Sequence, residues 1–349
     1  MKQAEQVVQT GQRGRTQTAE SKRRSVLKIL TAGAASTALG WQAFAQAQDS
    51  GGYPNKPIRL MVGFTPGGAT DIVARLIAQK LQDALGQSVV VENRPGAGSN
   101  LAAEYVARAN PDGYTLLLAT IANATNMSMY QTLNYDTQRD FAPVIQFMAA
   151  PSVLVVGASV PANNLGELIA LAKAKPGQLT FASSGSGGSP HLAGEMFKLR
   201  AGIDLIHVPY KGAAPAMTDV IGGVVTMGFK TALSALPQMQ AGKVKPIAIA
   251  ANKRLTQIPN VPTMAEAGFP DFEVSSWNGL VAPIKTPAEL IRKLNVECQK
   301  ILAMADIKEK FALQAAEPVG GSPEQFRDYI RVEIDRWAKV VKASGAKAE

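Results

Sequence analysis

Residues 58–85 read IRLMVGFTPGGATDIVARLIAQKLQDAL, and this stretch decides the fold class. Its first seven residues are almost continuously apolar, the segment TPGGATD follows with two adjacent glycines, and the remainder repeats apolar residues at helical spacing. An apolar run, a glycine-rich break and an amphipathic helix, in that order, predict a strand–loop–helix unit. A strand this apolar is typical of a parallel sheet that is covered on both faces, so an α/β fold is expected.

The same alternation of short apolar runs and helical periods continues along the chain. Strands are expected at residues 88–92, 114–119, 153–156, 179–182, 205–208, 225–229, 246–250 and 277–281, and helices at residues 101–109, 165–174, 190–199, 214–222, 287–304, 306–315 and 323–344. A chain of about 300 residues after the leader is too long for one compact core and suits two α/β lobes with mostly parallel sheets.

Two segments are expected to carry the chain between the lobes. Residues 149–151 precede an apolar strand, and residues 275–283 form a strand that leads into the helical C-terminal part. Lobe 1 is therefore predicted to comprise residues 48–149 and 277–349, and lobe 2 residues 150–276. The two crossover strands would form a hinge, with a cleft between the lobes.

The N-terminus is typical of an export signal. The basic segment Lys22–Lys28 precedes an apolar run, Ile29–Gly40, which is followed by the cleavage motifs Ala43-Phe44-Ala45 and Ala45-Gln46-Ala47. The run is shorter than the ~20 residues that span a bilayer, so residues 1–47 are predicted to be a signal peptide and leader, cleaved near Ala45 or Ala47, that sends the protein to the periplasm. The paired arginines within the basic segment resemble a twin-arginine signal, but Lys22 and Val26 depart from that pattern, so the route of export stays open.

The charge of the chain and the spacing of its possible metal ligands argue against a nucleic-acid-binding protein and against a metalloprotein. Residues 1–45 hold seven of the Lys/Arg and two of the Asp/Glu residues, which leaves 29 basic and 25 acidic residues, a net charge of +4. This excess is mild and spread along the chain, so nucleic-acid binding is not expected. The isolated His191, His207 and Cys298 show no metal-ligand spacing, and no metal or cofactor is predicted. Cys298 lies in an apolar helical period and is expected to be a buried, unreactive thiol.

The glycine-rich loop at residues 63–71 is the first segment that could bind a ligand. Gly67 and Gly68 allow backbone N–H groups to face one side, Thr70 is expected to cap the following helix, and Asp71 lies in its first turn. A strand, a glycine loop and a helix N-terminus form a ready anion site. An ordinary connection in which Asp71 only caps the helix explains the same residues.

Residues 183–191, SSGSGGSPH, form a second such loop after a strand. Ser189 as cap and Pro190 at the first helical position predict a helix start, and the serines offer short donors for a carboxylate. The loop matches neither a dinucleotide fingerprint nor a nucleophile elbow. His191 would either contact the ligand or pack against the loop.

Several motifs together resemble the substrate-binding receptors of tripartite tricarboxylate transporters, often called Bug receptors. They are YPNKPIR (residues 53–59), PGGATD (66–71), ENRPGAG (92–98), PDGYTL (111–116), Tyr135-Asp136 with Asp140-Phe141, PYKG (209–212), PNVPT (259–263) and EAG (266–268). The resemblance covers essentially the whole chain after the leader. It implies a type II periplasmic binding protein fold, in which the two glycine-rich loops face each other across the cleft.

The resemblance also implies a function and a set of ligand contacts. The protein would bind a small organic carboxylate, mono- or dicarboxylate and aliphatic or aromatic, and deliver it as a monomer to the membrane subunits of a secondary transporter. The expected ligand-binding residues are Phe64, Thr65, Gly67, Gly68, Thr70, Asp71, Thr120, Ser183, Ser184, Gly185, Ser186, Ser189, His191, Tyr210, Lys211 and Thr231. Lys230 and Thr231 stand where the family commonly has an acidic or amide residue facing the ligand. This departure argues against an amino-acid ligand and favours a ligand with a second carboxylate or a neutral ring at that place.

Two other functions share parts of this pattern. The same binding fold could pass its closed state to a sensor kinase instead of a transporter. A hydrolase could use one of the serines of residues 183–189, but the sequence offers no identifiable base for it. Binding without catalysis is therefore the expectation.

Overall fold

The computed structural model describes residues 52–346. The predicted leader, with cleavage near Ala45 or Ala47, lies outside the described residues. Within residues 52–346, none of the helices has the length and apolar character needed to cross a membrane.

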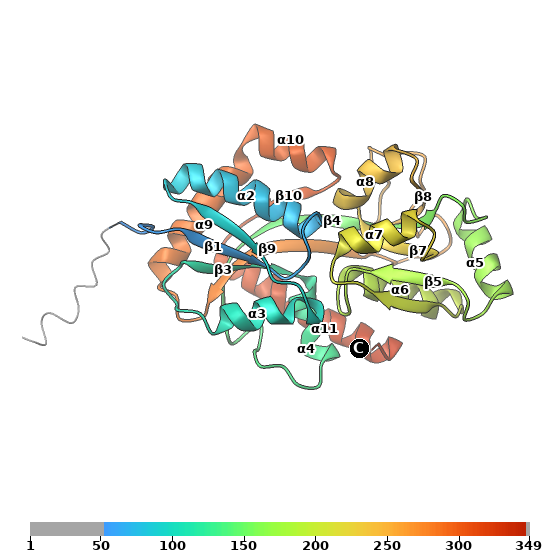
Figure 1. Ribbon diagram of the computed structural model, residues 1–349, viewed down its shortest axis with the longest axis horizontal. Coiled ribbons are helices and arrows are strands. Elements are labelled where there is room, and N and C mark those ends of the chain that lie inside the picture. Colours follow the sequence, from blue (N-terminus) through green and yellow to red (C-terminus); the bar gives the residue numbers. More distant parts are fainter. Residues whose placement is uncertain (1–51, 347–349) are drawn as a thin grey trace, which may run out of the picture. The chain divides into compact units, whose positions relative to one another are not determined.

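The first lobe is built on three parallel strands flanked by helices (Figure 1). It contains β1 (Ile58–Val62), α2 (Ala69–Leu85), β2 (Val89–Asn93), the 3-10 turn η1 (Ala97–Ser99), α3 (Asn100–Ala107), β3 (Thr115–Thr120) and α4 (Ile121–Met129). β1 lies between β2 and β3, and Leu60 at its centre stands opposite Val91 on one side and Leu116 on the other. This central, covered position explains why β1 is almost continuously apolar.

The second lobe repeats the same construction. It contains α5 (Leu165–Ala174), β5 (Thr180–Ser183), α6 (Ser189–Ala201), β6 (Ile206–Pro209), α7 (Ala213–Ile221), β7 (Met227–Thr231), α8 (Ala232–Gln240) and β8 (Val244–Ala250). β5 pairs in parallel with both β6 and β7. In each lobe, a parallel strand leads through a short connection into a helix.

Two long strands connect the lobes. β4 (Phe141–Gly157) and β9 (Ser275–Pro283) run antiparallel as far as Pro151 of β4. From Ser152 onward β4 pairs instead with β7 and β8 of the second lobe, while β9 also pairs with β3 of the first. The predicted α/β fold, with two lobes and a hinge of two crossover strands, is confirmed.

The sequence prediction covered only the end of β4 and omitted α4. β4 starts at Phe141, twelve residues before the expected strand, because Pro143 and Pro151 interrupt the strand pattern but fall at irregular points and at the lobe junction. α4 is rich in Asn and Thr and lacks an apolar period. Its start is stabilised locally, since Thr120 Oγ1 accepts from the N–H of residue 122 and the Asn123 side chain accepts from the N–H of Thr120.

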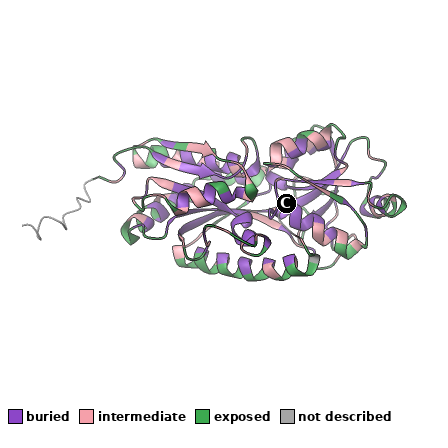
Figure 2. Ribbon diagram, turned by 60° about the horizontal axis from the view of Figure 1, so that its bottom comes forward, coloured by how far each residue is buried: buried purple, intermediate pink, exposed green. Residues whose placement is uncertain are grey.

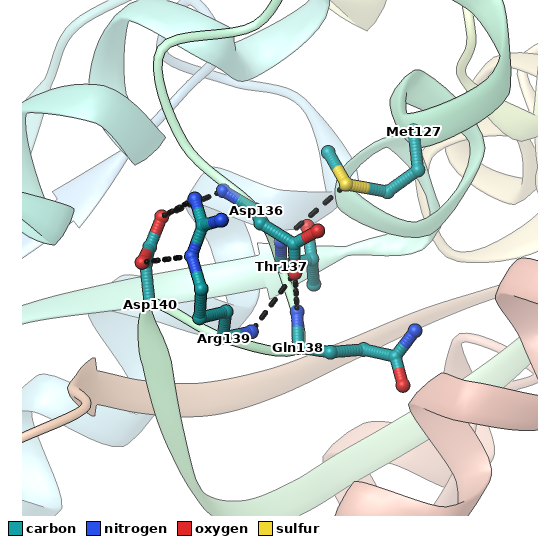
Figure 3. A network of polar contacts seen from close by, with 6 residues as sticks. All are labelled: Met127, Asp136, Thr137, Gln138, Arg139 and Asp140. Carbon is teal, nitrogen blue, oxygen red and sulfur yellow. Dashed lines mark hydrogen bonds and ion pairs between the residues drawn. The ribbon is translucent and has the colours of Figure 1, made fainter.

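A polar turn leads the chain into the hinge strand β4 (Figure 3). The Asp136 carboxylate accepts hydrogen bonds of 2.9 Å from the N–H groups of residues 138 and 139, and the Asp136 N–H donates to Asp140 Oδ2 at 2.7 Å. The Thr137 N–H donates to the sulfur of Met127, in α4, at 3.4 Å. The turn therefore ties the start of β4 to the last part of α4.

The C-terminal part of the chain covers the sheet of the first lobe. It contains α9 (Ala288–Ala303), α10 (Ala305–Leu313), β10 (Glu317–Gly320), which pairs with the first half of β4, and α11 (Pro323–Ser344). α11 packs against α4, β4 and also α6 of the second lobe. Figure 2 shows buried and exposed residues alternating along the outer helices, whereas the strands between them are buried.

Glu333 joins α11 to the hinge strand β9. Its carboxylate Oε2 accepts hydrogen bonds from the indole N–H of Trp277 in β9, at 3.1 Å, and of Trp337 in α11, at 2.9 Å. All three side chains are buried. The carboxylate is therefore the shared acceptor of two donors that have no access to water.

We expect Glu333→Leu to lower the free energy of unfolding by about 2–4 kcal/mol, because two buried indole N–H groups would lose their acceptor. Glu333→Gln retains a carbonyl oxygen that both donors can reach and should lose less than half as much. Urea denaturation of the three proteins measures the difference. Equal losses for the two variants would contradict the shared-acceptor role.

Candidate ligand-binding cleft

A small cavity of about 40 Å³ lies between the lobes. Residues of both lobes and of the hinge strand β9 line it. They are Phe64, Gly68, Ala69, Thr70, Thr120, Ile121, Ser184, Gly188, Ser189, Pro190, Ala213, Lys230, Thr231 and Ser276. Lys230 is the one ionisable residue among them, so the wall of the cavity carries a cation and no carboxylate.

Five helices begin at this cavity. The first residues of α2, α4, α6 and α7 and the residue before α8 all line it: Ala69, Ile121, Ser189, Ala213 and Thr231. Each helix follows a parallel strand of its lobe, so the carboxyl ends of β1, β3, β5, β6 and β7 meet at the cleft. The first N–H groups of a helix lack acceptors within that helix, and its dipole is positive at this end. Five such ends around one space favour an anion strongly.

Asp71 shapes the loop before α2. Its buried carboxylate accepts hydrogen bonds from the Gly67 N–H at 2.9 Å, from Arg75 Nε at 3.0 Å and from Asn93 Nδ2 at 3.0 Å. Burial by itself would raise the pKa of Asp71, but these donors hold the pKa below its usual value. Gly67 has a φ of 84°, which a residue with a side chain rarely adopts. The loop is thus held in one shape before a ligand arrives.

Two histidines support the second loop from behind. Ser183 Oγ lies 2.7 Å from Nε2 of His207 and accepts from the Gly185 N–H at 3.2 Å, while the Gly187 N–H donates to Nδ1 of His191 at 3.2 Å. The two imidazole rings stack with their centroids 4.1 Å apart. Burial is the main cause that lowers the pKa of His191 to about 4 and of His207 to about 3, so both rings are neutral at pH 7.

The Ser183–His207 pair has the spacing of a serine and its base, and the sequence did not reveal it. Ser183 is fully buried and does not line the cavity. Its hydroxyl is also engaged by the loop backbone at Gly185. The pair therefore holds the loop and does not present a nucleophile to the cleft.

The predicted helix caps are wrong by one or two residues. Gly68, not Thr70, occupies the cap position of α2, and Gly188, not Ser189, that of α6. Glycine provides no side-chain acceptor for the first N–H groups of either helix. In α6, Pro190 has no N–H and the His191 N–H donates to the carbonyl oxygen of Gly188 at 3.0 Å, so the Ser189 N–H is the first-turn donor left for a ligand. Thr70 and Ser189 lie in the first turns instead, where they line the cavity.

The two lobes touch around the cavity. The Thr65 N–H donates to the carbonyl oxygen of Lys211 at 3.2 Å, and the Thr125 hydroxyl donates to the carbonyl oxygen of Gly187. A side chain on Gly212 would collide with the Thr65 hydroxyl of the opposite lobe. The structure therefore has a closed arrangement of the lobes.

Lys230 lies at the end of β7 and is 2% exposed. Its Nζ atom is buried and has no hydrogen-bond partner within the described residues. Burial lowers the pKa of this ammonium to about 7. In the hinge strand, Asn278 stands opposite Thr120 in the β3–β9 pairing, and both polar atoms of its side chain are buried without a partner in the described part of the chain. The cleft region thus holds several polar groups that the protein itself does not satisfy.

The structure distributes the sequence-predicted residues among three places. Seven line the cavity: Phe64, Gly68, Thr70, Thr120, Ser184, Ser189 and Thr231. A second pocket of about 240 Å³, which Phe64 and Ser184 also border, adds Gly185, Ser186, Tyr210 and Lys211. Thr65, Gly67, Asp71, Ser183 and His191 line neither pocket and hold the loops or the lobe contact. Their roles as ligand contacts remain predictions.

The predicted ligand contacts omitted seven residues of the wall, of which only Lys230 had been singled out, from the resemblance: Ala69, Ile121, Gly188, Pro190, Ala213, Lys230 and Ser276. Lys230 carried a signal, because a lysine in an otherwise apolar strand is unusual in a buried sheet. Ala213 and Ser276 carried none, since their side chains are ordinary and only the fold brings them to the cavity.

Residues 73–346 match the family model of the tripartite tricarboxylate transporter family receptor. The chain belongs to this family. One relative, Protein BugT of Bordetella pertussis, is 41% identical over 297 residues, which cover 84% of this chain and 91% of that protein. The resemblance stated from the motifs is therefore confirmed.

Solved structures of the family agree with the fold. Rpa4515 of Rhodopseudomonas palustris, determined with adipate, is 38% identical, with a TM-score of 0.83 over 85% of this chain and 100% of that chain. MatC of the same organism, determined with malate, is 32% identical, with a TM-score of 0.80 over 83% of this chain and 100% of that chain. This chain shares the architecture of both proteins.

We expect Asp71→Ala to lower the free energy of unfolding at pH 7 by about 2 kcal/mol, because it removes the acceptor of three hydrogen bonds. The folded-state pKa of Asp71 is below the ordinary 3.8, so its stabilisation is complete above about pH 4 and is lost as the pH falls through the folded-state value. Urea denaturation from pH 7 to pH 3 should show the difference from wild type shrinking in acid. The exposed Asp83→Ala serves as the control, and a pH-independent loss for Asp71→Ala would contradict this role.

Proposed function

We propose that this protein is a periplasmic receptor that captures a small organic carboxylate in the cleft and delivers it to the membrane subunits of a tripartite tricarboxylate-type secondary transporter. The observation that carries the proposal is the convergence of five helix N-termini and one lysine on a cavity with no carboxylate in its wall. The adipate and malate of the related structures have the same chemistry.

One carboxylate group of the ligand would lie between the starts of α2 and α6, which come from opposite lobes. The first turn of α2 and the Ser189 N–H at the start of α6 provide backbone donors, and the hydroxyls of Thr70, Ser184 and Ser189 provide more. Because the donors belong to both lobes, a bound carboxylate bridges the cleft.

Capture would proceed by closure about the hinge. Residues 48–149 with 277–349 would move against residues 150–276, supported by the change of β4 from one sheet to the other at Ser152. The contact between Thr65 and Lys211 exists only when the lobes meet. A ligand favours the closed state by its higher affinity for it, and the closed surface would be what the membrane subunits recognise.

The proposed role includes export and excludes catalysis. The signal segment would be removed near Ala45 or Ala47, and the receptor would work as a monomer in the periplasm. Such a receptor releases its carboxylate chemically unchanged. The position of Ser183 agrees with this, because its hydroxyl is buried and bonded to His207 behind the loop.

We expect thermal denaturation with millimolar succinate, malate, adipate, hexanoate or benzoate to show a raised midpoint for at least one acid, because a ligand that binds the folded state stabilises it by mass action. For that acid, Ser184→Ala should weaken binding by about 10-fold or more, since a hydroxyl bond to a charged group is worth roughly 1.5–3 kcal/mol. Isothermal titration measures the affinities, with the exposed Ser159→Ala as control. No shift with any carboxylate, or unchanged affinity in Ser184→Ala, would contradict the proposed site.

A further inference from the structure

Lys230 is a basic group in a place that disfavours its charged form. It is 2% exposed, its Nζ has no hydrogen-bond partner among residues 52–346, and it shares the cavity with the first residue of α7 and the residue before α8. Removing an ammonium group from water is costly unless an opposite charge or acceptors compensate, and the positive ends of helices repel it further. An anion that reached Lys230 would offset this cost and favour the charged form.

The neighbouring elements provide no such partner. β4, β5, β9, α4 and α8 contain no ionisable residue. Five acidic or imidazole groups of α2, α6, α7 and β6 are bonded to other residues, and Lys211, between β6 and α7, is a further basic group. Asp219 of α7 accepts from the Tyr210 hydroxyl, Asp71 of α2 accepts from Gly67, Arg75 and Asn93, Glu195 of α6 accepts from Lys198, and His191 and His207 bond to the second loop.

Resting on the carboxylate receptor function proposed above, we infer that Lys230 determines ligand specificity by pairing with a second anionic group of the ligand. One carboxylate lies between α2 and α6, and the other reaches Lys230 at the end of β7. The site therefore selects dicarboxylates, because a monocarboxylate would leave the buried ammonium uncompensated.

This pairing has a consequence for proton binding. Burial lowers the pKa of Lys230 to about 7 in the empty cleft, and no charged group contributes to that shift. A carboxylate beside the ammonium would raise the pKa again, so binding takes up a proton above about pH 7. The affinity for a dicarboxylate should fall as the pH rises above 7 and should be independent of this group below it.

The test compares wild type with Lys230→Met, whose unbranched side chain is one atom shorter and carries no charge. The probes are succinate, malate and adipate, and the tightest binder is paired with its monomethyl ester. We expect Lys230→Met to weaken binding of the diacid about 10- to 100-fold, as for a lost charged hydrogen bond, and to change the affinity for the monoester less than about threefold on the same scale. The exposed Lys173→Met is the matched control and should change neither affinity.

Two further measurements distinguish a loss of contact between Lys230 and the ligand from a destabilised fold in the Lys230→Met variant. The thermal midpoint of ligand-free Lys230→Met should equal or exceed that of wild type, because the variant removes an uncompensated buried charge. For wild type, calorimetry at pH 8 in two buffers of different ionisation enthalpy should show uptake of up to one proton with the diacid and none with the monoester. This second measurement needs no variant.

The outcomes separate the two proposals. The role of Lys230 is overturned if Lys230→Met binds the diacid as tightly as wild type does, or if the variant weakens binding of the monoester as much as binding of the diacid. It is also overturned if wild type takes up no proton with the diacid. In each case the receptor function stands. If monocarboxylates bind and none of the diacids does, the same conclusion follows. If no carboxylate binds to the wild-type protein, the receptor function itself fails.

Discussion

The positive potential at the carboxyl ends of the parallel strands is the constraint on which the rest of the cleft depends. Right-handed strand–helix units place every helix start at the same edge of a sheet, and the two lobes turn these edges toward each other. The helix starts cannot satisfy one another, because all of them offer donors. The cavity therefore acquires its preference for anions from the backbone, before any side chain is considered.

Side chains preserve this preference for anions because they add no negative charge to the cavity. Asp71 is the acidic group nearest to the start of α2, and three donors hold its carboxylate against the loop, away from the cavity. The two histidines behind the second loop are neutral, so they stiffen the loop without adding charge to it. The charge of the empty cleft is thus concentrated on the helix starts and on Lys230.

Local pattern was sufficient to predict most of the fold. Strands such as β1 and helices such as α5 follow from apolar spacing, and the glycine-rich loops follow from their composition. α8 contains Pro237, and β10 is a four-residue strand, so neither carries a recognisable period. The long strand β4 could not be read as one element, because its two halves belong to different sheets.

The site was predictable only as far as its loops are contiguous in sequence. Residues of the two loops that line the cavity, such as Thr70 and Ser184, stand beside glycines and follow strands. Ser276 and Lys230 reach the cavity through strands that come together over long separations, and the Ser183–His207 contact joins residues 24 positions apart. Burial and pairing, which decide what Lys230 does, are properties of the assembled fold.

Gly212 separates the requirement for folding from the requirement for function. The three atoms nearest to a side chain placed there all belong to Thr65 of the opposite lobe, so the closest collision would be across the cleft. A methyl group on residue 212 would collide with Thr65 and keep the two lobes from closing. A substitution at residue 212 would therefore act on closure of the lobes. Measurements of folding stability would not detect this loss.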